Sequence, residues 1–193
     1  MKPILFSTEM VRAIQDLRKT QTRRVIKDKD ITNWFDIDVD GKPIAYIDQE
    51  TGDSYPPTHR AKYQPGDVLW VREKTYGTPN GTDNQDLCYA THCPCGFSDE
   101  EHAQVKGWRS PRFMPKEAAR IFLKVTNVRV ERLQDITDAD ILAEGFKCRE
   151  DFIVFWNILN EKRGHGWNKN DWVYAYNFEK ISKEEAERLE GMK

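Results

Sequence analysis

The residues with the most concentrated chemistry lie at positions 18–24, in the run RKTQTRR. This run holds four cations and two hydroxyl side chains. Over positions 12–29 there are seven cations against two acids, although the whole 193-residue chain has a formal net charge of only -2. Cationic side chains and hydroxyls are the usual partners of phosphate. The run therefore predicts an anion site, with Arg18, Thr20, Arg23 and Arg24 as binding residues, and a solvated basic face is the alternative.

Lys19 and Thr22 could also do chemistry. A Thr hydroxyl is a poor nucleophile until a base takes its proton, and a desolvated Lys among other cations can have a pKa low enough to serve. A carboxyl group would then protonate the leaving group. Glu144 and Glu73 are the candidates, and Glu144 lies at the carbonyl end of a predicted helix, where an acid is unfavourable. Residues three apart in a regular strand face opposite sides, so Lys19 and Thr22 need a bend between them.

Aromatic residues supply a second set of candidates, because bases of single-stranded nucleic acids stack on aromatic rings. Trp167 lies in a glycine-containing loop and is the best candidate for an exposed ring. We also count Trp70, Arg72 and Glu73, in the predicted strand at 68–73, among the binding residues. Core packing is the common alternative for Trp. His165 is as compatible with an ordinary loop position as with catalysis.

Cysteine and histidine cluster in one irregular stretch, as Cys88, His92, Cys93, Cys95 and His102. Zinc sites usually pair their ligands two to four residues apart. Here Cys93 and Cys95 are separated by a single residue, and the other spacings are irregular. We therefore expect ordinary reduced cysteines and no metal, with a structural zinc as the alternative.

Composition excludes several classes of protein. No apolar run approaches the ~20 residues that cross a bilayer, and the apolar run at the N-terminus is too short for a secretion signal. We expect a cytoplasmic protein without a membrane partner. A sequence pI of about 6.1 excludes a protein that coats nucleic acid through its overall charge. Walker, Rossmann, nucleophile-elbow and HExxH motifs are absent, so no cofactor is expected.

The elements that must position these residues follow from periodicity and capping signals. Alternating and β-branched residues predict strands at 3–6, 20–26, 35–39, 44–46, 68–73, 121–130 and 172–178. Helices are predicted after Ser7, from Thr137 to Gly145, over 152–159 and after Ser182. The spacing of strands and helices does not fit a doubly wound sheet. We predict one α+β domain over residues 1–193, built on a mostly antiparallel, barrel-like sheet, with polar insertions at about 28–62 and 76–107.

The order of these motifs resembles the ASCH-domain family, named for homology to an activating signal cointegrator, in the version common in phages and prophages. The resemblance rests on KPILFS at 2–7, RKTQTRR at 18–24, QPGD at 64–67, LWVRE at 69–73, VRVERL at 128–133, IT at 136–137 and AEG at 143–145. It spans most of residues 2–180 and is weakest over 28–62 and 76–107.

The resemblance implies a PUA-like β-barrel with short helices around a cleft, and recognition of a nucleoside, RNA or modified DNA. Small bacterial members hydrolyse the acetyl amide of N4-acetylcytidine. Their pattern implies Lys19 as base, Thr22 as nucleophile and Glu144 as proton donor. Those members are about half as long as this chain, so the insertions can change the substrate.

Three functions remain open on the sequence. The first is hydrolysis of an N-acyl group on a cytidine-like substrate by the Lys19–Thr22–Glu144 trio. The second is a non-catalytic module that binds RNA or modified DNA, or a ribonuclease. The third is a phage accessory protein that acts through protein contacts.

Overall fold

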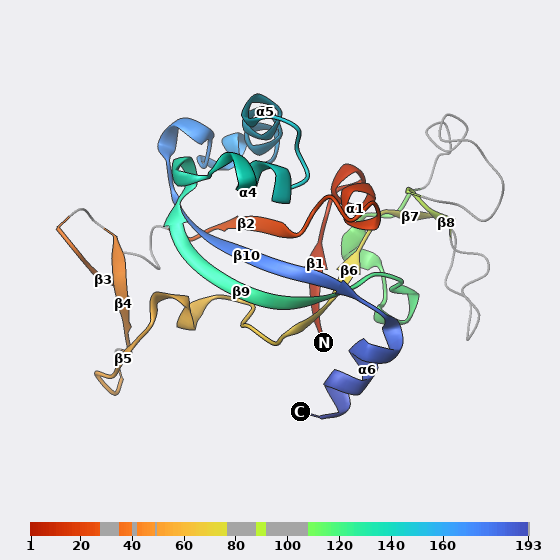
Figure 1. The fold of residues 1–193 in the computed structure, drawn as a ribbon, viewed down its shortest axis with the longest axis horizontal. Helices are drawn as coiled ribbons and strands as arrows, with labels where there is room; N and C mark the ends of the chain where they lie inside the picture. The colour runs from red at the N-terminus through yellow and green to blue at the C-terminus, as the bar shows by residue number, and fades with distance from the viewer. Residues whose placement is uncertain (28–34, 40–41, 49, 77–87, 92–107, 193) are drawn as a thin grey trace. The chain divides into compact units, whose positions relative to one another are not determined.

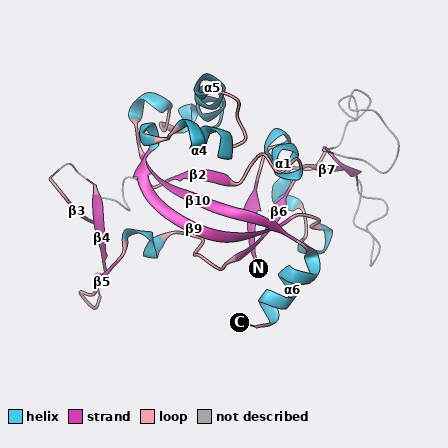
Figure 2. Ribbon diagram, viewed as in Figure 1, coloured by secondary structure: helices cyan, strands magenta, loops and turns pink. Residues whose placement is uncertain are grey.

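The computed structural model describes residues 1–27, 35–39, 42–48, 50–76, 88–91 and 108–192 (Figure 1). The described strands are, in chain order, β1 (Lys2–Leu5), β2 (Gln21–Val25), β3 (Phe35–Ile37), β4 (Pro43–Ile47), β5 (Ser54–Tyr55), β6 (Val68–Arg72), β7 (Thr75–Tyr76), β8 (Cys88–Tyr89), β9 (Phe122–Arg132) and β10 (Trp172–Ile181). The described α-helices are α1 (Thr8–Gln15), α4 (Asp138–Ala143), α5 (Arg149–Asn160) and α6 (Lys183–Gly191). The protein is thus of mixed α and β structure, as predicted, and Figure 2 shows how the two kinds of element are distributed.

The larger sheet has the strand order β1-β6-β9-β10-β2. β1 pairs with β6 in parallel, whereas β6 with β9 and β10 with β2 are antiparallel. Smaller sheets, β3-β4-β5 and β7-β8, come from the two stretches predicted as insertions. Within the described residues the larger sheet has two ends and does not close on itself. The mostly antiparallel sheet is therefore confirmed, and the closed barrel is not found.

The chain forms two compact units, and we describe each by itself. The first contains Met1–Leu17, Asp67–Lys124 and Lys180–Lys193, and the second contains Arg18–Gly66 and Val125–Glu179. The prediction of a single domain stays a prediction. Among the residues that the structure describes, no helix is both long enough and apolar enough to cross a membrane.

Each unit has its own apolar cluster. In the first unit Trp70 of β6 and Phe122 of β9 pack with Met114 and with Ala186 of α6. In the second unit Ile141 of α4 packs with residues of α5 and β10, among them Phe152, Trp156 and Val173. Burying such large side chains removes apolar surface from water, which is the main favourable contribution to folding. The second cluster holds α4 in the unit that also contains β2.

Local capping determines where α4 begins and ends. Thr137 accepts a hydrogen bond from the Asp140 N–H, and the Asp140 carboxylate accepts one from the Thr137 N–H, which completes a capping box. Gly145 follows the helix with φ of 92°, a left-handed conformation that glycine adopts without a steric cost. These signals place Glu144 at the C-cap of α4, as the sequence predicts.

Candidate functional site

The basic run at 18–24 connects α1 to β2. Leu17 has φ of 59°, and this left-handed residue ends the helical turn before the run begins. Lys19 then forms an isolated antiparallel bridge with Glu144, and the Thr20 N–H donates to the Ala143 carbonyl at 2.8 Å. The backbone of the run is therefore held against the C-terminal end of α4, although Lys19 and Glu144 are 125 positions apart.

The Lys19 ammonium group has an acceptor for each of its three protons. Nζ donates to Glu144 Oε2 at 2.6 Å, to the Glu144 carbonyl at 2.9 Å and to the Gln21 carbonyl at 2.7 Å. The side chain of Lys19 is 1% exposed and that of Glu144 is 5% exposed. A neutral amine has only two protons to donate. The three acceptors therefore indicate that the resting form is the ammonium, paired with the Glu144 carboxylate.

The second oxygen of Glu144 is also paired with a cation. Arg23 Nη1 donates to Glu144 Oε1 at 3.1 Å. The remaining guanidinium nitrogens of Arg23 donate to Glu131 Oε1 at 3.0 and 2.5 Å, and Nη2 lies 3.3 Å from Asp140 Oδ2. Two buried cations thus donate hydrogen bonds to the two oxygens of one carboxylate.

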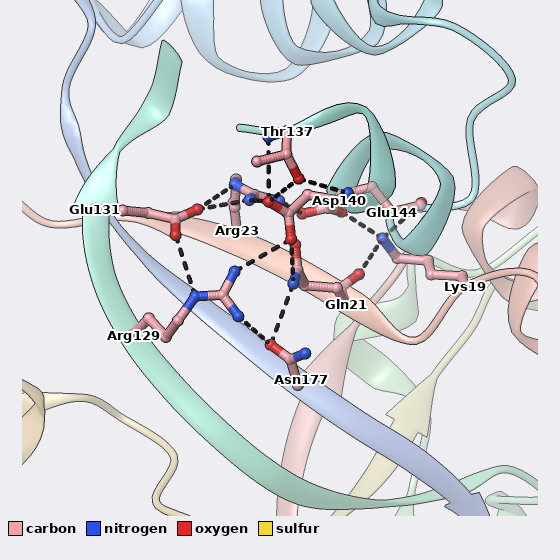
Figure 3. A network of polar contacts seen from close by, with 9 residues as sticks. All are labelled: Lys19, Gln21, Arg23, Arg129, Glu131, Thr137, Asp140, Glu144 and Asn177. Carbon is pink, nitrogen blue, oxygen red and sulfur yellow. Dashed lines mark hydrogen bonds and ion pairs between the residues drawn. The ribbon is translucent and has the colours of Figure 1, made fainter. Parts of the chain in front are cut away.

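This ion pair belongs to a larger polar network, which Figure 3 shows from close by. The nine residues come from β2, β9, α4 with its cap, and β10, together with Lys19 before β2: Lys19, Gln21, Arg23, Arg129, Glu131, Thr137, Asp140, Glu144 and Asn177. Gln21 Nε2 donates to Asp140 and Asn177, and Arg129 donates to Glu131, Asp140 and Asn177. Three cations face three acids, so the network is neutral overall.

Burial and charge shift the protonation equilibria of this network. Burial lowers the pKa of Lys19 from its ordinary value, against the opposing effect of the Glu144 charge and hydrogen bond. Burial by itself would raise the pKa of Asp140. Hydrogen bonds from Thr137 and Gln21 and the charge of Arg23 outweigh that effect and lower the pKa to about 2. Asp140 therefore stays ionised over the whole neutral range.

Thr22 lies on the other face of β2 from the network. In the antiparallel pairing with β10 it is opposite Tyr176, whereas Gln21 is opposite Asn177 and Arg23 is opposite Ala175. Side chains alternate along a strand, so the hydroxyl of Thr22 points away from Gln21 and Arg23. Thr22 is 5% exposed. None of the three acceptors around Lys19 Nζ is the Thr22 hydroxyl. The structure brings Lys19 and Glu144 together, and it does not add Thr22 to that contact.

The four predicted anion-binding residues have different environments. Arg18 and Thr20 are exposed, and Arg18 Nη1 donates to the Gly145 carbonyl at 3.2 Å. Arg24 is half-buried, and burial lowers its pKa against the effects of Tyr63 and other neighbours. Arg23 is fully buried among carboxylates. Its guanidinium already has anionic partners, so Arg23 is part of the internal network, and the prediction of an anion site is left with the other three residues.

The three candidates in the strand at 68–73 are buried or half-buried. Trp70 is 5% exposed and belongs to the apolar cluster of its unit, so packing is its role here. Glu73 is buried and accepts two hydrogen bonds of 2.8 Å from Arg120, which form a bidentate ion pair. Thr91 Oγ1 donates to the same carboxylate at 3.0 Å. Arg72 is half-buried, with its guanidinium 4.7 Å from the centre of the Trp70 ring.

The sequence predicts an exposed ring for Trp167. In the structure this ring is packed against another aromatic residue. Trp167 is half-buried, and its ring meets Phe152 edge to face at 6.1 Å. In the same loop His165 Nδ1 lies 2.8 Å from Asp171 Oδ2, and Lys169 Nζ lies 3.1 Å from Asp171 Oδ1. The described contacts of Trp167 are those of a packed aromatic residue.

Sequence reasoning missed most of the network around the Lys19–Glu144 pair. Asp140 was recognised only as a capping residue, and Gln21, Arg129, Glu131 and Asn177 were not singled out. One signal was available: Arg129 and Glu131 alternate with the apolar Val128 and Val130 at the end of the predicted strand 121–130 and one residue beyond it, so a strand continued to Glu131 would place both side chains on one face. Their charges could have indicated a polar partner on that face. The partner itself depends on which strand and helix lie against it.

The cysteine-rich stretch is mostly outside the described residues. This applies to His92, Cys93, Cys95 and His102, and to the side chain of Cys88. In the part of the chain that the structure describes, no three His, Cys, Asp or Glu side chains are grouped so that they could hold a metal ion. The prediction of ordinary loop cysteines stays a prediction.

Comparisons with known proteins give only a distant structural likeness. No protein-family model matches the chain, and no curated protein is similar to it in sequence. Protein EF3133 from Enterococcus faecalis V583, assigned to the family model DUF984, is similar in structure with a TM-score of 0.45 and 10% sequence identity. The alignment covers 94% of this chain and 82% of that one.

Proposed function

We propose that the protein binds a nucleoside or nucleic-acid base and hydrolyses an N-acyl group on a cytidine-like substrate, with Lys19, Thr22 and Glu144 as catalytic residues. The observation that carries the proposal is the buried contact of 2.6 Å between Lys19 Nζ and Glu144 Oε2. A base and an acid within one hydrogen bond of each other can exchange a proton without solvent. The resemblance to ASCH-domain amidohydrolases supplies the reaction class.

The ion pair provides both catalytic groups through one proton transfer. When Lys19 Nζ gives a proton to Glu144 Oε2, the pair becomes a neutral amine and a carboxylic acid. The low-dielectric surroundings of these buried groups reduce the cost of that change, because they disfavour both charges. Arg23 on Glu144 Oε1 opposes it, because a guanidinium stabilises the carboxylate. Arg23 is therefore a positioning residue that sets how often the neutral pair forms.

The proposed reaction has two steps, acylation of Thr22 and hydrolysis of the resulting ester, and each step regenerates the ion pair. The Thr22 hydroxyl attacks the acyl carbon as the Lys19 amine takes its proton, and Glu144 protonates the departing exocyclic amine. The C–N bond breaks, an acyl ester of Thr22 forms, and Lys19 and Glu144 are again ammonium and carboxylate. After a second proton transfer within the pair, water attacks the ester, Lys19 takes the proton of that water, and Glu144 protonates Thr22 Oγ1. For Thr22 to take part, its side chain must reach Lys19 in the substrate complex.

The test is release of acid from N4-acetylcytidine and other N-acylated nucleosides, followed by chromatography of the deacylated product. We expect turnover by the wild type, a loss of more than a hundredfold in Thr22→Ala and Glu144→Gln, and partial activity in Thr22→Ser, which keeps a hydroxyl. Thr126→Ala is the matched control, because it removes an exposed hydroxyl of β9 in the same unit, at a residue with no proposed role. Inactivity of the wild type across the panel, or full activity of Thr22→Ala, would show that the proposed chemistry is wrong.

A second candidate is a non-catalytic module that binds RNA or modified DNA. The complete pairing of Lys19 and Glu144 favours it, because groups whose hydrogen bonds are all made inside the protein have none left for a substrate. Exposed Arg18 would then contact phosphate, with Lys27 as another exposed cation of the same segment. Binding of single-stranded RNA should weaken steeply with salt and should fall on charge reversal of Arg18 and Lys27. Binding that ignores both salt and charge reversal would contradict this candidate, and RNA cleavage lost in Lys19→Met would indicate a ribonuclease.

A further inference from the structure

Helix α5 carries apolar side chains on two of its faces. Phe152 and Trp156 are buried and belong to the apolar cluster of the second unit. A second set of apolar side chains in the same helix is exposed or half-buried: Val154, Phe155, Ile158 and Leu159. Single exposed apolar residues are common on protein surfaces. Several of them on one face of one helix indicate a surface that contacts another molecule.

This second set follows the spacing of one helical face. Counted from Asp151, its members lie three, four, seven and eight positions further on, and Lys162 lies eleven positions further on. Residues at these intervals form one stripe along a helix. Lys162 lies in the 3-10 turn Glu161–Arg163, which continues α5. The outer stripe of α5 is therefore defined by six residues: Asp151, Val154, Phe155, Ile158, Leu159 and Lys162.

The middle of the outer stripe is apolar and open. Val154 is 60% exposed, Ile158 is 71% exposed and Leu159 is 43% exposed. The ring of Phe155 packs against that of Phe146, with 5.3 Å between the ring centres. Covering these side chains would remove apolar surface from water, which is the main driving force of protein association.

The two ends of the outer stripe have opposite charges. Glu150 and Asp151 lie in the first turn of α5, whereas Lys162 and Arg163 lie in the turn that continues it, and all four are exposed. This distribution complements the helix dipole, but the dipole does not account for the apolar side chains between the two ends. A face that is acidic at one end, apolar in the middle and basic at the other is complementary to an antiparallel copy of itself.

We propose that the outer stripe is the interface of a symmetric dimer, in which α5 packs antiparallel against α5 of a second copy of this chain. A two-fold axis between positions 156 and 157 matches residues of opposite charge at the ends and apolar residues in the middle. The pairs, one residue from each copy, are Glu150 with Arg163, Asp151 with Lys162, Val154 with Leu159, and Phe155 with Ile158. Each pair occurs twice, because a two-fold interface uses the same patch on both copies. Stable interfaces likewise have an apolar centre and a polar rim.

The size of α5 limits the strength of this dimer. A helix of 12 residues is about 18 Å long. Interfaces below about 1,200 Å² are typical of weak complexes, so we expect a dissociation constant of about 10 µM. The inference does not rest on the proposed hydrolysis, because no residue of the outer stripe belongs to the Lys19–Glu144 network.

The test is sedimentation equilibrium of the full chain from about 1 to 300 µM, a range that brackets the expected dissociation constant. The wild type should pass from the mass of one chain, 22.7 kDa, towards twice that mass. Ile158→Lys should raise the dissociation constant at least tenfold, because it places a charge in the apolar centre. Ile44→Lys is the matched control, since it makes the same change at a 51% exposed isoleucine of β4 in the same unit. It should leave the dissociation constant unchanged.

Charge reversal tests the antiparallel arrangement. Asp151→Lys would face Lys162 of the partner copy, and Lys162→Asp would face its Asp151. Each variant should therefore raise the dissociation constant by about tenfold. The double variant, Asp151→Lys with Lys162→Asp, restores both pairs of opposite charge and should dimerise nearly as well as the wild type. In a parallel arrangement each of these residues would face its own counterpart, so the single changes would have little effect.

Several outcomes would overturn the inference. A wild type that keeps the mass of one chain at every concentration shows that no second copy covers the stripe. In that event an unchanged urea midpoint for Ile158→Lys leaves the stripe to a different partner, and a lowered midpoint shows that the chain itself covers it. An unchanged dissociation constant for Ile158→Lys places the dimer interface elsewhere. A double variant that dimerises no better than the single ones refutes the antiparallel pairing.

Discussion

Replacing Glu144 with Gln should destabilise the second unit more than any other single change in the network. The change leaves the Lys19 ammonium buried without the carboxylate that it now contacts at 2.6 Å. Arg23 is less affected, because it keeps Glu131 and Asp140. Removing one partner of a buried ion pair costs about 3–5 kcal/mol. For a protein of this size that corresponds to a fall in melting temperature of roughly 6–20 °C.

A double-variant cycle isolates the contribution of the pair. Lys19→Met removes the buried cation and leaves Glu144 paired with Arg23, so we expect it to cost less than Glu144→Gln. The double variant has no unpaired ammonium and should be more stable than Glu144→Gln by itself. Urea unfolding followed by tryptophan fluorescence and circular dichroism measures all four proteins, and Glu131→Gln serves as a control at a more exposed carboxylate of the network.

The cycle has one result that refutes the reasoning. If the two single changes add to within about 0.5 kcal/mol of the double variant, Lys19 and Glu144 do not interact in solution. The buried contact would then contribute nothing, and the observation that carries the proposed hydrolase would be lost. An interaction energy above about 1 kcal/mol supports the pair.

Three further predictions concern the ionised groups Asp140, Lys19 and Glu73. The pKa of Asp140 is about 2 in the folded protein, against a reference value of 3.8. Ionised Asp140 should therefore add about 2 kcal/mol to the free energy of unfolding above pH 4, and Asp140→Asn should lose it. In acid titrations the difference in stability between wild type and Asp140→Asn should vanish as the pH falls through 2. Burial lowers the pKa of Lys19, so the folded protein releases this proton at a lower pH than the unfolded chain. The stability of the wild type should therefore rise relative to that of Lys19→Met as the pH increases from the folded pKa towards 10.5. The opposite trend would show that the effect of Glu144 on the pKa of Lys19 exceeds that of burial. Glu73→Gln should destabilise the first unit by about 3 kcal/mol, by leaving Arg120 without its charged partner, whereas an unchanged urea midpoint would contradict that role.

Much of the secondary structure follows from the sequence because its signals are local. The capping box between Thr137 and Asp140 needs only groups three residues apart, and the left-handed Gly145 needs only its own missing side chain. The apolar run of β6 and the alternation in β9 likewise identified both strands. The same local signals place Glu144 at the end of α4.

Tertiary structure decided which charged side chains are buried and which are exposed. Arg23 and Arg18 lie in the same basic run, yet one is buried among three carboxylates and the other is exposed. Sequence cannot separate them, because the acids that surround Arg23 come from β9 and α4, more than a hundred positions away. Trp70 likewise became core through its packing with β9 and α6, and not through its own type.

The sequence alone determined that Lys19 and Thr22 stand at a junction between a helix and a strand, and that a strand alternation would separate them. Only the tertiary structure showed which of them meets Glu144. Lys19 does so through the bridge to the end of α4, whereas Thr22 follows the pleat of β2 to the face opposite Arg23. The physical reason is that a strand fixes the direction of its side chains locally, and the partners on each face come from distant parts of the chain.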